Sequence, residues 1–369
     1  MRRLSTLLLT LPLLAATPPP LVEHTIASDL QGGYQVVAAD LNHDGRLDLI
    51  ALASGMTELA WYENPGWQRH VLAAGQRRLI NCVVVGNEIV LAGEFSMQAK
   101  DSAGVVSVLR PGVDPREPWT VTEIDRLSTA HRLRTADIDG SGKLVVINAP
   151  LTGAAAAAPD YRDQTPLVYY IPGEWKRRVI GTENSGVVHG IVVTDWDGNG
   201  REGILSASFT GIHLFRYGKD ARWTRTEIAK GDPAPWPKSG SSDIAVGHIG
   251  KARFLAAIEP WHGNQVAVYT QRGAQWEREV IDSSLVDGHT IQVADLNGDG
   301  VDEIAAGFRG QPRSVYLYSF DAAAKRWVRG DLDKGGMGAA ACIVADLNKD
   351  GRPDIACIDS TRLKWYENR

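Results

Sequence analysis

The chain has 369 residues, of which 22% are charged and 44% hydrophobic, and it contains 38 glycines and 18 prolines. This balance is typical of a folded protein with many turns, and it excludes an intrinsically disordered chain. The formal net charge of -5 comes without any run of Lys and Arg that could form a basic face, so nucleic acid is not an expected partner.

The first residues predict export from the cytoplasm. Arg2 and Arg3 precede the apolar run STLLLTLPLLAA, which is too short to span a bilayer and has the order of a secretory signal peptide. We expect a signal peptide over residues 1–17 and a secreted or periplasmic mature chain over residues 18–369. No later stretch reaches the roughly 20 apolar residues of a membrane helix, so no membrane span is expected.

The rest of the chain is built from an internal repeat. Three segments superimpose without a gap, namely VVAADLNHDGRLDLIAL (36–52), IQVADLNGDGVDEIAAG (291–307) and CIVADLNKDGRPDIACI (342–358). Four weaker copies bring the total to seven, with starts near residues 34, 80, 131, 189, 242, 289 and 340. Each copy has two apolar runs joined by an Asp/Gly turn, then a third run rich in Tyr and Val, then a fourth. Four strands per repeat predict an all-β fold, a seven-bladed β-propeller of four-stranded antiparallel blades.

The fourth run opens with Trp in six of the seven copies, and the last copy has none. The chain instead ends on LKWYENR, which matches the third run AWYENPG of the first copy. The segment LVEHTIASD (21–29) resembles the fourth runs WQRHVLAAG and WEREVIDSS apart from its Leu start. We therefore expect residues 21–29 to complete the last blade and close the ring, so that residues 18–369 form a single domain.

The Asp/Gly turn follows the template D-x-[DN]-x-[DN]-G-x-x-[DE], which can direct side-chain oxygens at positions 1, 3, 5 and 9 toward one cation. Hard oxygen ligands of this kind favour Ca²⁺. The complete copies are Asp40, Asn42, Asp44 and Asp48; Asp295, Asn297, Asp299 and Glu303; and Asp346, Asn348, Asp350 and Asp354. A weaker copy keeps Asp195, Asp197 and Asn199 but has Gly203 at position 9, and another has Asp137, Asp139 and Ser141 with Val145 there. At these two turns we expect weak binding or none.

These turns resemble the FG-GAP/VCBS repeat family, which also includes the propellers of integrin α-chains. The resemblance implies a structural Ca²⁺ at the matching Asp and Asn positions. An Asx-rich turn without metal is the alternative interpretation.

Candidate functional residues gather at the face of the ring where the first strand of each blade begins, called here the upper face. His131, His189 and His289 each stand six residues before the first Asp of a turn, where the other copies have Tyr34, Ile80, Ser242 and Ala340. The turns between second and third strands should emerge on the same face. They contribute Glu259, Trp261, His262, Phe308, Arg309 and Arg313, and a long insertion over residues 149–166 contributes Tyr161 and Arg162 and could fold over the channel mouth.

Several functions remain open for this face. His131, His189, His289 and Tyr161 could act as acid and base in a β-elimination on a sugar. The histidines could hold a transition metal, although no short ligand spacing supports this. The aromatic and Arg side chains could instead bind a carbohydrate or another extracytoplasmic ligand without chemistry, which is the function favoured by the sequence alone. A protein-interaction platform is a further alternative, and so is a purely structural role in which the histidines hydrogen-bond loop backbones.

The histidines placed before the Asp/Gly turns of a seven-bladed ring also resemble the propeller of aldos-2-ulose dehydratase, and more loosely propeller polysaccharide lyases. This resemblance implies an elimination reaction on sugars, without assigning a role to any single residue.

The three cysteines do not form a disulfide framework. Cys82 and Cys342 occupy a repeat position that is Val36 or Ile191 in other copies, which favours small buried hydrophobes. A bond between Cys342 and Cys357, on adjacent predicted strands, is the alternative.

Overall fold

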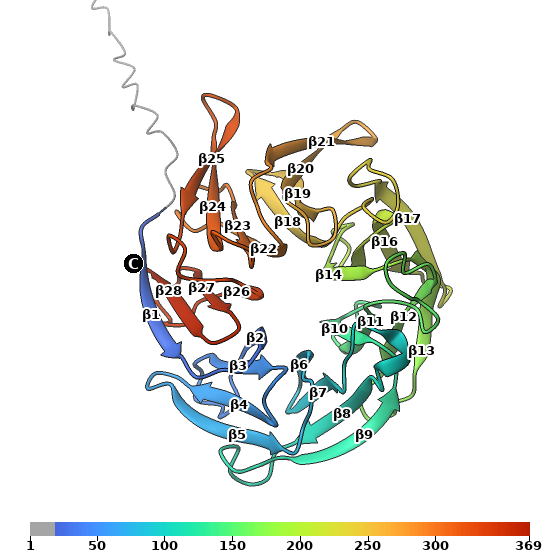
Figure 1. The fold of residues 1–369 in the computed structure, drawn as a ribbon, viewed down its shortest axis with the longest axis vertical. Coiled ribbons are helices and arrows are strands. Elements are labelled where there is room, and N and C mark those ends of the chain that lie inside the picture. Colours follow the sequence, from blue (N-terminus) through green and yellow to red (C-terminus); the bar gives the residue numbers. More distant parts are fainter. Residues whose placement is uncertain (1–18) are drawn as a thin grey trace, which may run out of the picture.

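The protein forms a closed ring of seven four-stranded sheets around a central channel (Figure 1). The structure is a computed structural model that describes residues 19–369. The predicted signal peptide, residues 1–17, lies outside the described residues. Each sheet is antiparallel, and its strands follow one another outward from the channel, which confirms the predicted seven-bladed propeller.

The strands of the first four blades are the following. Blade one contains β2 (Gly33–Ala39), β3 (Asp48–Ala53), β4 (Glu58–Glu63) and β5 (Gln68–Ala74). Blade two contains β6 (Asn81–Val85), β7 (Glu88–Gly93), β8 (Val105–Arg110) and β9 (Thr120–Arg126). Blade three contains β10 (Ala130–Ala136), β11 (Val145–Pro150), β12 (Gln164–Tyr170) and β13 (Arg178–Ser185). Blade four contains β14 (Val188–Thr194), β15 (Gly203–Ser208), β16 (Gly211–Tyr217) and β17 (Trp223–Ala229).

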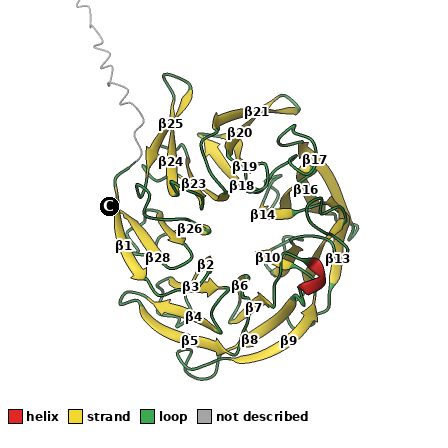
Figure 2. Ribbon diagram, viewed as in Figure 1, coloured by secondary structure: helices red, strands yellow, loops and turns green. Residues whose placement is uncertain are grey.

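The remaining three blades complete the ring. Blade five contains β18 (Asp243–Ile249), β19 (Ala252–Glu259), β20 (Gln265–Arg272) and β21 (Gln275–Asp282). Blade six contains β22 (Gly288–Ala294), β23 (Glu303–Phe308), β24 (Ser314–Asp321) and β25 (Arg326–Asp331). Blade seven contains β26 (Ala341–Ala345), β27 (Asp354–Ile358), β28 (Leu363–Asn368) and, from the other end of the chain, β1 (Leu21–Ala27). Within residues 19–369 the single helix is the short 3₁₀ turn η1 (Ala99–Asp101), drawn in red in Figure 2.

The first and last strands of the described chain close the ring as predicted. Strand β1 pairs antiparallel with β28, which places His24 opposite Trp365, just as His70 lies opposite Trp61 in blade one. The strand ends at Ala27, two residues before the predicted limit. The N-terminal segment thus supplies the outer strand that the C-terminal repeat lacks.

The core is divided among the interfaces between blades. The second strand of blade one, DLIALA, is apolar over most of its length because its two faces pack against different neighbours. Leu49 and Ala51 face blade seven, whereas Ile50 and Leu52 face blade two. The seven interfaces are each filled by one hydrophobic cluster of this kind. Full burial of a Leu or Ile side chain contributes about 1.5–3 kcal/mol, so these interfaces dominate the stability of the ring.

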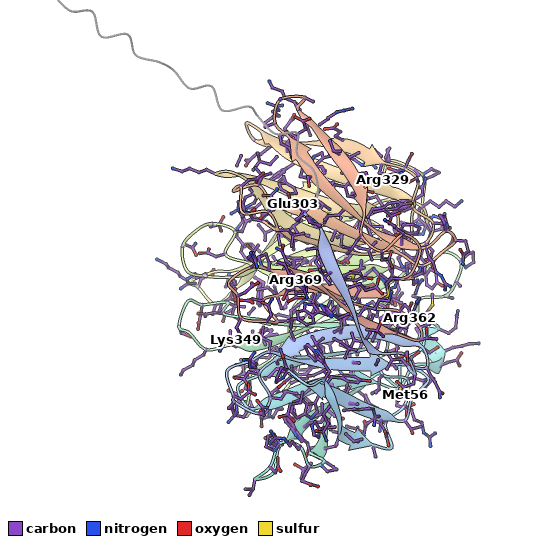
Figure 3. All side chains as sticks on the ribbon, turned by 90° about the vertical axis from the view of Figure 1, so that its left-hand side faces the viewer. Met56, Glu303, Arg329, Lys349, Arg362 and Arg369 are labelled. Atoms are coloured by element: carbon purple, nitrogen blue, oxygen red, sulfur yellow. A yellow bond between two sulfur atoms is a disulfide. The ribbon has the colours of Figure 1, made fainter. Side chains whose placement is uncertain are left out.

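The ring has two distinct faces. In the side view, Lys349, in the Asp/Gly turn of blade seven, and Met56, in the turn between β3 and β4, lie at opposite faces (Figure 3). The Asp/Gly turns share the lower face, and the starts of the inner strands share the upper face with the turns between second and third strands. In the part of the chain that the structure describes, no helix is long and apolar enough to cross a membrane.

The cysteine prediction was wrong for one pair. Cys342 and Cys357 lie directly opposite each other on β26 and β27 and form a disulfide, with their Cα atoms 4.1 Å apart. This short spacing is that of a cross-strand pair that exchanges no ladder hydrogen bonds, in which side chains come closest together. Cys82 is buried and free, as predicted for a small hydrophobe.

Candidate functional site

A β-bulge near the start of four inner strands directs one side chain of each strand into the channel. In β10, β14 and β22 the pairing register with the next strand shifts at His131, His189 and His289, so that each histidine is the extra, unpaired residue. The same shift occurs in β2 at Tyr34. A bulge bends the strand and turns the extra side chain away from the regular alternation. The bulges therefore aim four polar rings at the upper mouth of the channel.

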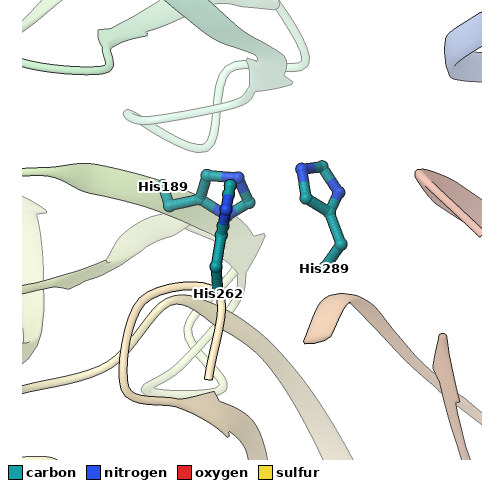
Figure 4. Close-up of side chains that lie close together, drawn as sticks. All are labelled: His189, His262 and His289. Carbon is teal, nitrogen blue, oxygen red and sulfur yellow. The ribbon is translucent and has the colours of Figure 1, made fainter. Parts of the chain in front are cut away.

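Three histidines from different elements converge at this mouth (Figure 4). His189 and His289 come from the bulges, and His262 comes from the turn between β19 and β20. Their ligand atoms all lie within 4.8 Å of one another, and they form the single group of three or more His, Cys, Asp or Glu side chains this close within residues 19–369. His131 stands beside them, with its ring centroid 5.2 Å from that of His189. The predicted histidines thus meet at one place.

The hydrogen bonds of these rings leave nitrogens free toward the pocket. Nδ1 of His289 donates to the carbonyl oxygen of Ala340 at 2.5 Å, and because a carbonyl can only accept, Nε2 presents its lone pair. Nδ1 of His189 contacts Oγ of Ser242 at 3.2 Å. Nε2 of both residues is buried without a hydrogen-bond partner. Such unpartnered buried nitrogens fit a divalent transition metal, which binds neutral imidazole.

The electrostatic environment keeps the histidines neutral. Burial lowers the pKa of His131, His189 and His289 well below the usual value of 6.5. Positive charge adds to this effect, chiefly from Arg132 at the first two rings and from Arg309 at His289. A neutral imidazole is the form that binds a metal or accepts a proton.

Tyr34 is a site residue that the sequence reasoning did not select. Its hydroxyl lies 2.8 Å from Nε2 of His131, while Nδ1 of the same histidine is buried and has no partner. Burial raises the pKa of Tyr34, so the phenol stays protonated. Tyr34 could have been found by treating its repeat position as one ring of residues rather than searching that position for histidine.

The rings enclose a small pocket of about 70 Å³, called here the histidine pocket. Its walls are Tyr34, Phe95, Met97, His131, Leu151, His189, Trp261, His262, His289 and Arg309. The guanidinium of Arg309 donates to both carboxylate oxygens of Asp287, at 2.9 and 3.0 Å, and lies 3.2 Å from Nδ1 of His262. Asp287 also lies 3.2 Å from this Nδ1. Asp287 therefore orients both Arg309 and His262. After Tyr34, it is the second site residue that the sequence did not reveal.

The long insertion of blade three covers one side of the pocket. Tyr161 does not line it but packs edge-on against Trp261, with ring centroids 5.4 Å apart. Arg162 lies over the ring of Trp236 at 4.8 Å, and Nε1 of Trp236 donates to the carbonyl of Asp160. Through Tyr161, the insertion packs against Trp261 and supports this wall of the pocket.

Three further predicted residues lie outside the pocket. Glu259 is fully buried and receives hydrogen bonds from Tyr269 and Arg278, so it fixes the edge of blade five. Phe308 packs on Tyr316 in the core between blades five and six. Arg313 is not among the side chains that form the pocket walls.

The Asp/Gly turns on the lower face fold alike in the three complete copies. In blade one, Asp40 accepts the backbone N–H groups of Asp44 and Gly45. Asp48, at position 9, is fully buried and accepts the backbone N–H groups of Leu41 and Asn64. Asp354 in blade seven accepts the equivalent pair, and Glu303 in blade six accepts the first of them. The position-9 carboxylate thus ties the turn to its blade.

In the incomplete turn of blade four, an arginine side chain pairs with an Asp of the turn. Arg216 donates to both carboxylate oxygens of Asp197, at 2.7 and 3.1 Å. In blade one the corresponding strand position is Glu63, which accepts from Asn42 of the turn. The polarity is reversed in blade four, and Gly203 supplies no carboxylate at position 9. Weak metal binding or none at this turn stays a prediction.

Comparisons with known proteins point to one similar propeller. The family model described as "Aldos-2-ulose dehydratase, beta-propeller domain" matches residues 103–272. Aldos-2-ulose dehydratase from Phanerodontia chrysosporium is 27% identical over 322 residues, covering 76% of this chain. This chain is similar to the propeller of that dehydratase. It spans only 35% of the relative's length, so the match concerns one part of a larger protein.

A solved structure supports the fold alone. The crystal structure of Saccharomyces cerevisiae Sqt1 matches 96% of this chain with a TM-score of 0.58 and 8% sequence identity.

The segment that matches the dehydratase family model runs from blade two to blade five, so it includes His131, His189 and His262. The resemblance to FG-GAP/VCBS repeats stays a prediction.

Proposed function

We propose that the histidine pocket catalyses dehydration of a keto-sugar by β-elimination. The observation that carries the proposal is the convergence of two buried histidines and the partly buried His262 beside a Tyr34–His131 pair in a small pocket with aromatic walls. The similarity to aldos-2-ulose dehydratase supports the same reaction class. The proposal replaces simple carbohydrate binding, which the sequence alone favoured.

His131 is the proposed base and acid. In the tautomer whose Nε2–H donates to Tyr34, Nδ1 offers a lone pair to the hydrogen on the carbon next to the ketone. That C–H bond breaks as the N–H bond forms, and the electron pair moves into an enolate. The imidazolium then returns a proton to the hydroxyl group on the following carbon, which leaves as water. Tyr34 holds the ring in this orientation.

His189, His262 and His289 form the proposed metal site. A divalent transition metal such as zinc, when bound there, would polarise the ketone oxygen and stabilise negative charge on the enolate. The free Nε2 atoms of His189 and His289 fit this role. Asp287 fixes the orientation of His262 and the carbonyl of Ala340 fixes that of His289, as outer partners of metal ligands commonly do.

The walls would select a small substrate. Trp261 and Phe95 offer flat faces for a sugar ring, and Arg309 offers hydrogen-bond donors. The pocket, of about 70 Å³, is smaller than typical ligand pockets, so only the reacting end of a sugar would enter it.

The first prediction tests the chemistry. Zinc-loaded protein incubated with a panel of 2-keto-sugars should produce the ultraviolet absorbance of a carbonyl conjugated to a new double bond. His131→Gln should lower kcat about 100-fold or more, because the proton transfer loses its general base. His248→Gln, on a half-exposed residue remote from the pocket, is the matched control and should retain full activity.

Two outcomes would overturn the proposal. One is the absence of product across the panel, and the other is unchanged kcat in His131→Gln. Sugar affinity without product, measured by calorimetry and lost in Trp261→Ala, would instead support a binding protein.

We also propose that the three complete Asp/Gly turns bind Ca²⁺ in a structural role. Asp40 and its counterparts already direct their oxygens toward the interior of the turn, where they accept backbone N–H groups. An oxygen-rich turn of this shape suits Ca²⁺ better than softer metals.

A further inference from the structure

A second cavity lies in the channel directly beneath the histidine pocket. It measures about 260 Å³ and is lined by the inner strands, including β2, β10, β18 and β22. Gln35, Arg132 and Thr290 on its wall are the residues that follow Tyr34, His131 and His289 in the chain. The two cavities are therefore adjacent layers of one channel.

Two arginines on the wall of the channel cavity, Arg132 and Arg134, form no ion pair with any described residue. Arg132, only 4% exposed, donates from Nε to the carbonyl of His189 and from Nη1 to the side-chain oxygen of Gln35. Arg134, two residues along the same strand, donates to the carbonyl of Leu133. Neither guanidinium has a carboxylate oxygen within 4.0 Å among the described residues. Both retain N–H groups for a further acceptor.

Arg132 is buried and Arg134 is partly buried. A buried arginine without an ion pair is unusual, and Lys364, the other buried Lys or Arg side chain in the described part of the chain, pairs with Glu23 at 2.6 Å. Removing a guanidinium from water without a counter-charge is costly, so buried charges normally have partners. Asp243 is the one carboxylate on the wall of this cavity, and it accepts the backbone N–H of Ile291 instead of pairing with an arginine.

We infer that the channel cavity binds a small monovalent anion, a halide or a carboxylate, between Arg132 and Arg134. Two guanidinium groups and one carboxylate leave one net positive charge, which one such anion neutralises. Arginine provides several N–H donors in a fixed plane, which suits a carboxylate as well as a halide. The cavity volume exceeds what either anion needs, so water would complete its coordination.

The experiment uses the purified protein with bromide and acetate as probes. Ionic strength is held constant with lactobionate, whose disaccharide acid is too bulky for the cavity. Bromide or acetate should raise the melting temperature of the wild-type protein in a saturable way, and a bromide-soaked crystal should show an anomalous peak between the two guanidinium groups. A response to bromide alone identifies a halide site, and a stronger response to acetate identifies a carboxylate site.

Two substitutions should move affinity in opposite directions. Arg134→Gln should weaken the apparent Kd about tenfold or more, because it removes a charged donor. Asp243→Asn keeps the shape but removes the negative charge, so it should tighten the apparent Kd. Arg272→Gln removes an exposed cation and is the matched control, expected to bind like wild type.

The proposal is overturned if Arg134→Gln and Asp243→Asn respond to bromide and acetate as the wild type does, if neither anion raises the melting temperature of the wild type, or if a protein that responds to bromide shows no anomalous peak in the channel. Should Arg134→Gln fail to fold, the tightening expected in Asp243→Asn still decides the question. No keto-sugar and no transition metal enters the experiment, so its outcome is independent of the proposed dehydration.

Discussion

At the scale of single residues, the repeat determines which residues stand at the channel mouth, whereas strand pairing determines where their side chains point. His131, His189 and His289 share one repeat position, so the sequence predicted their convergence. Tyr34 was missed because its side chain differs although its bulge is the same. Glu259 was selected for its loop, but the phase of β19 turns it toward Tyr269 and Arg278. Strand phase and bulges depend on pairing, which the residue types alone do not determine.

His213 makes a prediction about pH. This buried residue of β16 lies outside the pocket, and burial, together with the charge of Arg225, lowers its pKa to about 4. The nearest acidic group is Glu227, whose carboxylate is 4.0 Å away. Because an unfolded histidine has a pKa near 6.5, the folded state binds fewer protons, and its stability should fall as pH decreases from about 6.5 to 4.

Urea unfolding of the wild type and of His213→Gln at pH 7.5 and pH 4.5 measures this contribution. The stability advantage of the wild type should be smaller at the lower pH. A difference between the two proteins that does not change with pH would refute the assignment.

At the scale of elements, the blade is a sheet fastened at its lower end by an Asp/Gly turn. The sequence predicted the turn and its Asp and Asn positions. It did not predict that Asn368 of the WYEN segment donates across the blade boundary to the carbonyl of Leu296 at 2.7 Å, as Asn64 does to that of Leu347. These contacts arise only when blades are neighbours, so a single repeat cannot reveal them. The disulfide of blade seven was likewise misjudged, because its cross-strand distance is a property of the paired sheet.

The calcium proposal is testable with two matched substitutions. Asp346 and Asp195 both accept two backbone N–H groups of their own turn, but only Asp346 belongs to a complete turn. Asp346→Ala should reduce bound Ca²⁺ by one ion per chain and lower the melting temperature measured with Ca²⁺ more than the value measured with chelator. Asp195→Ala should lower both values equally. An identical Ca²⁺ content in the wild type and in Asp346→Ala would contradict the proposal.

At the scale of the whole molecule, ring closure creates the site. The pocket takes rings from blades one to six, and no two adjacent copies would suffice. The sequence predicted this closure from the truncated LKWYENR and the displaced LVEHTIASD, because counting strands requires no geometry. The small size of the pocket, the close approach of its histidines and the arginines beneath it could be seen only in the closed ring.

The most direct measurement uses a 2-keto-sugar deuterated at the carbon next to the ketone, incubated with the zinc-loaded protein and analysed by mass spectrometry. Elimination by His131 predicts a product lighter than the substrate by one HDO, formed by the wild type and at least about 100-fold more slowly by His131→Gln. Recovery of intact deuterated sugar from the wild-type protein, or an equal rate in both proteins, would contradict a dehydratase at the histidine pocket.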